Sequence, residues 1–103
     1  MFEIRVEHRF KLDYQRVIRV HPQLKADFAE AVEELMQTGR VPEEYRPHVL
    51  DNPGGNYNDG HIDFHLSDGK IDVIVLYLPH KTNPIIRLVR MGMHEELFQG
   101  PTL

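Results

Sequence analysis

The sequence has no cysteine, no long apolar run and no excess of glycine or proline. Without cysteine, the chain has neither a disulfide framework nor a thiolate metal site, and this composition suits a reducing cytosol. No stretch approaches the roughly 18 to 20 apolar residues that span a bilayer. Residues 1–11 are charged and alternating, where a secretory signal needs an apolar block. We therefore expect a soluble, cytoplasmic protein with no membrane partner.

Positive charge is also scarce. The net charge is −4, with six basic against three acidic side chains in residues 1–25 and six against thirteen in residues 26–103. A basic face is the usual footprint of a protein that binds a polyanion, so this balance opposes extended nucleic-acid binding unless the positive charge is local. The candidates for local charge are four arginines of the first quarter, namely Arg5, Arg9, Arg16 and Arg19.

What remains is an ordinary globular composition, with 41% hydrophobic and 27% charged residues. A chain of 103 residues is long enough for one compact core and too short for two. We therefore expect a single domain over residues 1–103, in which every functional group shares one core and one surface.

The first part of the chain predicts a strand and two helices. Alternation over residues 2–6 is typical of a half-buried strand. Asp13 is placed to cap a short helix. The apolar stripe of this helix consists of Phe10, Tyr14, Val17 and Ile18. After Pro22, apolar residues recur at helical spacing until Gly39, which ends a second helix.

The rest of the chain predicts a loop followed by strands. Residues 41–60 contain many turn-forming residues, and His48 lies within this stretch. Residues 61–66 alternate, followed by apolar runs at 71–78 and 85–91 with turn signals between them. The order predicts an α+β fold of two layers, in which an N-terminal strand and two helices pack on a mainly antiparallel sheet. A short helical turn is expected at the C-terminus.

Four spaced motifs resemble the YafQ branch of the RelE/ParE toxin superfamily. They are Gly39-x-Val41-Pro42-x-x-Tyr45-x-x-His48, Asp59-Gly60-His61-Ile62, Tyr77, and Arg90-x-Gly92-x-His94-x-x-Leu97-Phe98. They occur in the family's order, and their combination is more specific than any fragment alone. The resemblance implies a single toxin domain with the two-layer RelE-like fold.

The resemblance also implies an activity and partners. Family members are toxins of type II toxin-antitoxin systems that cut mRNA, typically on the translating ribosome, and a small antitoxin protein silences them. We accordingly expect a metal-independent endoribonuclease, an mRNA interferase that needs no cofactor. Its expected partners are a cognate antitoxin, mRNA and the ribosome, and no DNA contact by the toxin itself is expected.

Residue by residue, the resemblance places His48, His61 and His94 at the three histidine positions of the active site. Arg90 matches a basic residue beside the site, and Phe98 matches the terminal aromatic. We expect His48 and His61 to be the acid/base pair, His94 to be a second proton-transfer or phosphate-contacting group, and Arg90 to support charge in the transition state. RNA cleavage without a metal needs a base for the 2′-hydroxyl, a cation for the phosphorane and an acid for the 5′-oxygen. Histidine serves such tasks because its unperturbed pKa of roughly 6.5 makes both protonation states accessible near neutral pH. Phe98 is expected either to stack on an RNA base or to anchor the C-terminus in the core.

The sequence departs from the family at one active-site position. The family usually has an aspartate four residues after the strand histidine, and here that position is His65. Alternation puts His61, Asp63 and His65 on one strand face, so Asp63, together with Asp68, is a nearby substitute for the missing carboxylate. We expect His65 and Asp63 to contact substrate.

Other functions are compatible with the same residues. His61, Asp63 and His65 are also an ordinary solvated strand face or a ligand set for a divalent ion. The acidic charge and His65 at the aspartate position are consistent with a weakened toxin that acts as a protein-binding module. A third alternative is a protein target such as DNA gyrase, as in the ParE branch, although such chains are not expected to keep this histidine set.

Overall fold

The structure is a computed structural model that describes residues 1–50, 60–66, 71–93 and 97. Two helices and five strands follow one another along these residues, with a short 3-10 helix between α2 and β2. Their bounds are β1 (Glu3–Val6), α1 (His8–Val20), α2 (Leu24–Thr38), η1 (Glu43–Tyr45), β2 (His48–Val49), β3 (Ile62–His65), β4 (Ile74–Pro79) and β5 (Ile85–Gly92). Within the described ranges, no helix is long and apolar enough to cross a membrane.

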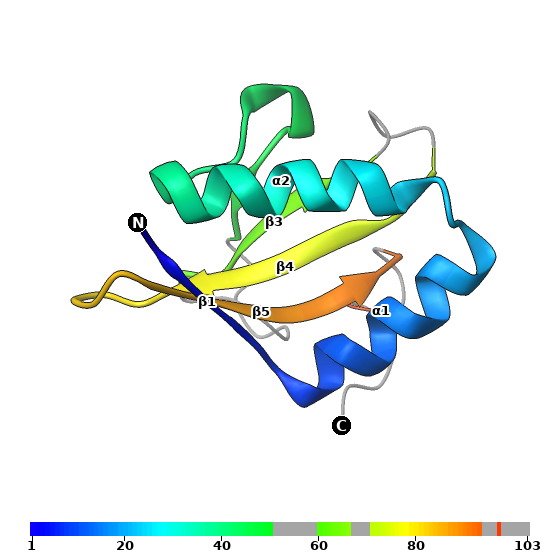
Figure 1. Ribbon diagram of the computed structural model, residues 1–103, viewed down its shortest axis with the longest axis horizontal. Helices are drawn as coiled ribbons and strands as arrows, with labels where there is room; N and C mark the ends of the chain where they lie inside the picture. Colours follow the sequence, from blue (N-terminus) through cyan, green and yellow to red (C-terminus); the bar gives the residue numbers. More distant parts are fainter. Residues whose placement is uncertain (51–59, 67–70, 94–96, 98–103) are drawn as a thin grey trace.

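The five strands form one sheet in the order β1-β5-β4-β3-β2. Strand β1 is parallel to β5, and the other neighbouring strands are antiparallel. Both helices lie against this sheet (Figure 1). The predicted α+β fold with a mainly antiparallel sheet is therefore confirmed. The amide of Leu97 donates to the carbonyl of Met93, and the rest of the predicted C-terminal turn lies outside the described residues.

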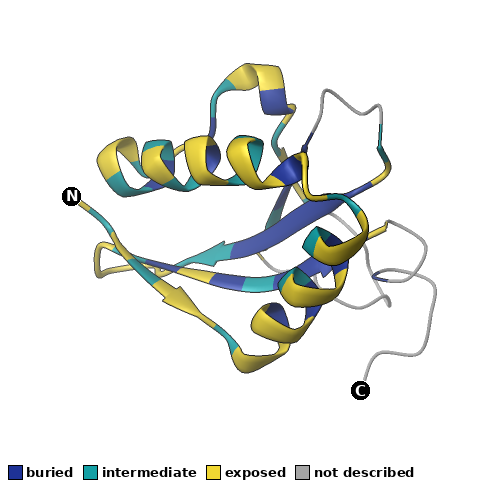
Figure 2. Cartoon of the chain, turned by 45° about the vertical axis from the view of Figure 1, so that its right-hand side comes forward, coloured by how far each residue is buried: buried dark blue, intermediate teal, exposed yellow. Residues whose placement is uncertain are grey.

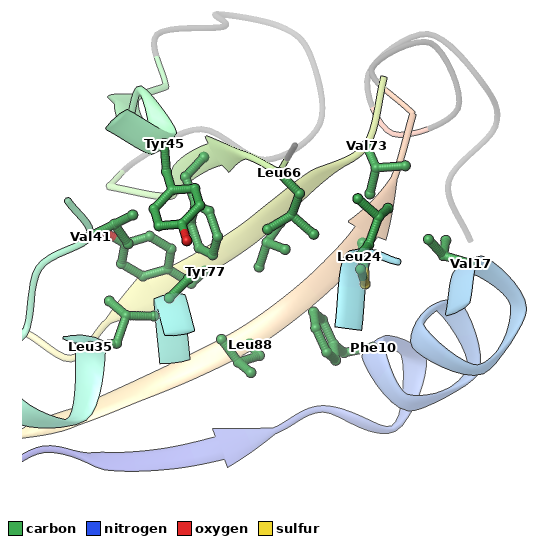
Figure 3. Close-up of a cluster of buried hydrophobic side chains, with 14 of the residues drawn as sticks. Phe10, Val17, Leu24, Leu35, Val41, Tyr45, Leu66, Val73, Tyr77 and Leu88 are labelled. Carbon is green, nitrogen blue, oxygen red and sulfur yellow. The ribbon is translucent and has the colours of Figure 1, made fainter. Parts of the chain in front are cut away.

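The main core lies between the helices and one face of the sheet. The helices bury apolar side chains spaced three, four or seven residues apart, which is the pattern of an amphipathic helix. The buried residues that they contribute include Phe10, Val17, Leu24, Ala31 and Leu35. The strands contribute alternate residues, among them Phe64, Val75, Tyr77 and Leu88. Figure 3 shows side chains from both layers in contact across this core.

The opposite face of the sheet is buried at its centre as well. Since strand side chains alternate, the neighbours of Phe64 and Val75 point away from the helices. These neighbours include Asp63, Ile74 and Leu76, all of which are buried. In Figure 2 strand β4 is coloured as buried along most of its length, whereas the outer faces of the helices are exposed. Polar groups on this second face therefore sit beside fully buried aliphatic side chains.

Two local predictions are wrong, and both errors have the same physical origin. Asp13 does not cap a helix, because α1 begins at His8 and Asp13 lies within it, buried at 4% exposure. His48 does not lie in a loop, because it forms the two-residue strand β2 with Val49. In each case a partner distant in sequence determines the local structure, as the contacts of the site show.

The end of α2 depends on a glycine that has little room for a side chain. Gly39 has φ +75°, and a Cβ atom there would lie 2.6 Å from Cζ of Phe2. We expect Gly39→Ala to lower the free energy of unfolding by about 1–3 kcal/mol, because it adds this clash to the cost of a left-handed conformation. Urea unfolding monitored by circular dichroism measures the loss.

Gly60 provides the matched control for this substitution. Its φ is +98°, but among the described residues the nearest atom to an added Cβ is Cδ1 of Leu78 at 3.9 Å. Gly60→Ala therefore introduces backbone strain without a clash, and we expect a loss of about 1–2 kcal/mol. If Gly60→Ala lowers the free energy of unfolding as much as Gly39→Ala or more, the contact with Phe2 does not contribute to the effect at Gly39.

Candidate active site

The candidate active site is built where the short strand β2 pairs with β3. His48 lies opposite Asp63 in this antiparallel pair, and Val49 lies opposite Ile62. Residues directly opposite each other project from the same face of a sheet. The Nδ1 atom of His48 is 2.9 Å from Oδ1 of Asp63, with the histidine side chain 59% exposed and the carboxylate side chain 5% exposed. The pairing thus joins a solvent-accessible imidazole to a buried carboxylate.

This hydrogen bond determines the tautomer of His48. An ionised carboxylate only accepts hydrogen bonds, so Nδ1 of His48 must carry the proton that it donates to Asp63. The neutral ring then has its lone pair on Nε2. A histidine held in this way has one defined orientation and one defined basic atom. Fixing both is the role that a carboxylate plays in a catalytic dyad.

His65 completes a cluster with these two residues. It follows Asp63 by two positions in β3 and therefore lies on the same face of the sheet. The rings of His48 and His65 meet edge to face with centroids 5.6 Å apart. Each of the three residues, His48, Asp63 and His65, offers one nitrogen or oxygen atom, and these atoms all lie within 4.8 Å of one another. We call this group the His48–Asp63–His65 cluster.

The other predicted site residues are placed differently. His61 immediately precedes β3, is half-buried, and accepts a hydrogen bond at its carbonyl from the amide of Leu50. It is not a member of the cluster. The alternation of the strand suggests His61, Asp63 and His65 as a ligand set, but in the structure His48 takes the place of His61. His94 and Phe98 lie outside the described residues.

Arg90 is buried and makes an ion pair with Asp13 of α1. Its Nε atom is 2.6 Å from Oδ2 of Asp13, and its Nη2 atom is 3.3 Å from Oδ1. Oδ2 of Asp13 also accepts a hydrogen bond of 3.1 Å from the amide of Met91. Strand β1 pairs with β5 only as far as Leu88, so Arg90 lies beyond the covered part of this edge. The structure therefore places the guanidinium against α1, where the carboxylate of Asp13 balances its charge.

Two tyrosines of the matched motifs are structural. Burial raises the pKa of Tyr77 to about 12. The pKa of Tyr45 is also raised to about 12, first by burial and then by the negative charges of Glu30 and other acidic residues. Both phenols therefore remain protonated near neutral pH. Their rings pack against Phe64 with centroid distances of 5.8 and 6.2 Å, which supports β3 from the side opposite the cluster.

The sequence motifs leave out one exposed basic residue that lies two positions before His48 in the chain. Arg46 is exposed, lies two residues before His48, and has a left-handed backbone with φ 50° at the end of η1. Non-glycine residues in this conformation are uncommon and often occur at functional sites. By contrast, β1, which carries Arg5, is at the opposite edge of the sheet from β2. Arg5, the first arginine of the basic N-terminal segment, therefore lies at the edge of the sheet farthest from the cluster.

Comparison with solved structures identifies the class of fold. A metal-bound toxin from Helicobacter pylori is 24% identical to this chain and superposes with a TM-score of 0.75, covering 95% of this chain and 100% of that chain. YafQ from Escherichia coli strain BL21(DE3) is 19% identical with a TM-score of 0.71, and the shares covered are 94% and 98%. A chain of the E. coli DinJ-YafQ complex is 19% identical with a TM-score of 0.70, again covering 94% and 98%. The architecture is the RelE-like toxin fold.

Sequence comparison then identifies the family. The family model described as "Bacterial toxin of type II toxin-antitoxin system, YafQ" matches residues 2–99. No curated protein sequence matches the chain significantly. The chain belongs to the YafQ family of type II toxins, and the resemblance stated from the motifs is confirmed.

Proposed function

We propose that this chain is an endoribonuclease that cleaves mRNA by metal-independent histidine chemistry and that a cognate antitoxin silences it. The observation that carries the proposal is the 2.9 Å hydrogen bond between His48 and Asp63 on the face that also bears His65. A solvent-accessible imidazole with a carboxylate behind it is suited to accept a proton from a substrate.

In the proposed reaction His48 is the general base. Its Nε2 lone pair accepts the proton of a ribose 2′-hydroxyl, and the 2′-oxygen attacks the adjacent phosphorus. The bond from phosphorus to the 5′-oxygen breaks, and an acid protonates the departing oxygen. The products are a 2′,3′-cyclic phosphate and a 5′-hydroxyl. The imidazolium of His48 that forms is stabilised by Asp63, 2.9 Å away.

The remaining roles follow the family positions. We assign His61 and His94 to proton transfer to the leaving oxygen and to contact with the phosphate, and Phe98 to stacking on a base. His65, beside His48, is assigned to substrate contact in the place of the family's aspartate. Arg46 is exposed, lies two positions before His48, and is assigned to supply local positive charge. Arg90 is assigned to support charge in the transition state, and its ion pair with Asp13 lowers the positive charge that it offers to substrate.

The partners are proposed on the same basis. The E. coli relative has been solved as a complex of DinJ with YafQ, which supports a dedicated antitoxin for this chain. A substrate of single-stranded mRNA, presented by the ribosome, fits the small size of the cluster and the acidic net charge, since the ribosome positions the message without an extended basic surface on the toxin.

The test is RNA cleavage by the purified chain in a translating extract, with cut sites mapped by primer extension. We expect discrete cuts in the message and 2′,3′-cyclic phosphate ends. A variant with His48→Asn, His61→Ala and His94→Ala is expected to leave the message intact. Intact message with the unaltered chain would instead favour the protein-binding alternative, and cleavage that survives the triple change would place the chemistry elsewhere.

A further inference from the structure

The His48–Asp63–His65 cluster has the composition of a transition-metal site. It offers two imidazole nitrogens and one carboxylate oxygen, the donor set that Zn²⁺ and Cu²⁺ favour, whereas Ca²⁺ and Mg²⁺ prefer oxygen donors alone. Residues two apart in a strand rarely converge on one ion by themselves. Here the convergence comes from His48, which β2 places opposite Asp63.

The spacing of the donor atoms is close to what an ion requires. All three lie within 4.8 Å of one another. Around a tetrahedral ion with bonds of about 2.0–2.1 Å, donor atoms are separated by about 3.3–3.4 Å. Reaching this separation needs small side-chain rotations, and His48 can make them because its side chain is 59% exposed. The two residues of β3 are held more firmly, since Asp63 is buried and His65 is half-buried.

Burial of the carboxylate adds a driving force for binding a cation. Asp63 is 3% exposed and lies opposite Leu76, which is fully buried. A carboxylate in such surroundings loses much of its hydration, and a nearby positive charge compensates for that loss. A divalent ion supplies more charge than a protonated His48 does, and it reaches the site from the solvent side of that histidine.

We infer that the His48–Asp63–His65 cluster binds one Zn²⁺ or Cu²⁺ ion through three protein ligands and that the ion inhibits the toxin. Inhibition rests on the proposed function: an imidazole that coordinates a metal and has lost its hydrogen bond to Asp63 no longer acts as the base. Metal binding itself does not depend on the proposed function. The fourth coordination position remains open to water or to a phosphate oxygen.

The experiment is isothermal titration calorimetry of the untagged full chain with Zn²⁺ alone. We expect one ion for each unaltered chain and a loss of affinity of about 100-fold or more in His65→Ala, since even residues that only support metal ligands change affinity by about 10–100-fold. His48→Asn, which keeps a donor to Asp63, is expected to show a comparable loss. The control His80→Asn alters an exposed histidine in the β4–β5 turn and is expected to bind as the unaltered chain does.

Each remaining outcome decides one part of the inference. No binding by the unaltered chain, or equal binding by His65→Ala and His48→Asn, would overturn the metal site. For inhibition, one equivalent of Zn²⁺ should lower RNA cleavage by the unaltered chain and a zinc chelator should restore it. Binding without an effect on cleavage would overturn the inhibition alone. If the chain cleaves no RNA even without zinc, the proposed function fails, and the calorimetric result still decides the metal site.

Discussion

Replacing His48 with asparagine is expected to lower the rate of RNA cleavage by about 10²–10⁴-fold, the usual contribution of a positioned general base. Asparagine is chosen because its side-chain amide nitrogen lies near the position of Nδ1 and donates to Asp63 in the same way. The buried carboxylate therefore keeps its hydrogen bond, and we expect the free energy of unfolding to change by less than about 1 kcal/mol. Single-turnover cleavage and urea unfolding measure the two quantities.

The same substitution at His80 is the control. His80 is exposed, and its Nδ1 atom accepts backbone hydrogen bonds from Thr82 and Asn83 at 3.2 and 3.0 Å. Asparagine can accept both through its side-chain oxygen, so each variant retains the local hydrogen bonding that histidine provides. We expect His80→Asn to cleave RNA at the unaltered rate. Equal activity of the His48 and His80 variants would remove His48 from the chemistry.

Replacing Asp13 with leucine is expected to lower the free energy of unfolding by about 3–5 kcal/mol, because it breaks a buried ion pair by removing the carboxylate that the guanidinium of Arg90 contacts. Both side chains are almost fully buried, with Arg90 7% exposed and Asp13 6% exposed. The amide of Met91 also loses its acceptor. Since small domains are stable by only about 5–15 kcal/mol, this single change removes a large part of the total. Thermal and urea unfolding measure the loss.

A second change distinguishes the ion pair from other effects at Asp13. Adding Arg90→Met to Asp13→Leu also removes the buried guanidinium that Asp13 contacts, and we expect most of the loss to be recovered, apart from about 1–3 kcal/mol for the Met91 amide that loses its acceptor. Arg16→Ala is the control, because Arg16 is 52% exposed and 3.5 Å from the same carboxylate; its loss should stay below about 1 kcal/mol. If Asp13→Leu/Arg90→Met is no more stable than Asp13→Leu, loss of the Asp13–Arg90 ion pair is not the cause of the destabilisation.

The double variant also tests the predicted role of Arg90 in catalysis. If Arg90 supports charge on the phosphorane, the Asp13→Leu/Arg90→Met protein should cleave RNA more slowly than the unaltered chain at a temperature where both are folded. If Arg90 acts only through its contact with α1, cleavage at a temperature where the variant is folded should match that of the unaltered chain. Comparing rates under fully folded conditions separates the two.

The parts of the fold that the sequence predicts are those determined by local periodicity. The alternation of residues 2–6 and 61–66 predicts β1 and β3, and the run before Gly39 predicts α2, because each segment places its apolar side chains on one face. The histidine motifs indicate the family for a different reason, namely their residue types and their order along the chain, and the match of the family model confirms the family. The periodicity lies within short stretches of the chain, whereas the motifs are informative in combination over residues 39–98.

The parts that the sequence does not predict depend on distant partners. Strand β2 has only two residues, too few for any period, and it exists because His48 and Val49 pair with β3. Asp13 has the residue type of a helix cap, yet Arg90, far along the chain, holds it inside α1. The candidate site follows from the first of these contacts, so the sequence named Asp63 as a member without showing that it holds His48.

The parallel pairing of β1 with β5 joins the first and the last strand of the described residues, with Glu3 opposite Ile85. During synthesis β1 and α1 are made before β5, so the edge of β1 stays unpaired and Asp13 lacks its contact with Arg90 until β5 has been made. A fragment that ends before β5 is therefore expected to expose both the unpaired edge of β1 and the carboxylate of Asp13, which the complete sheet covers.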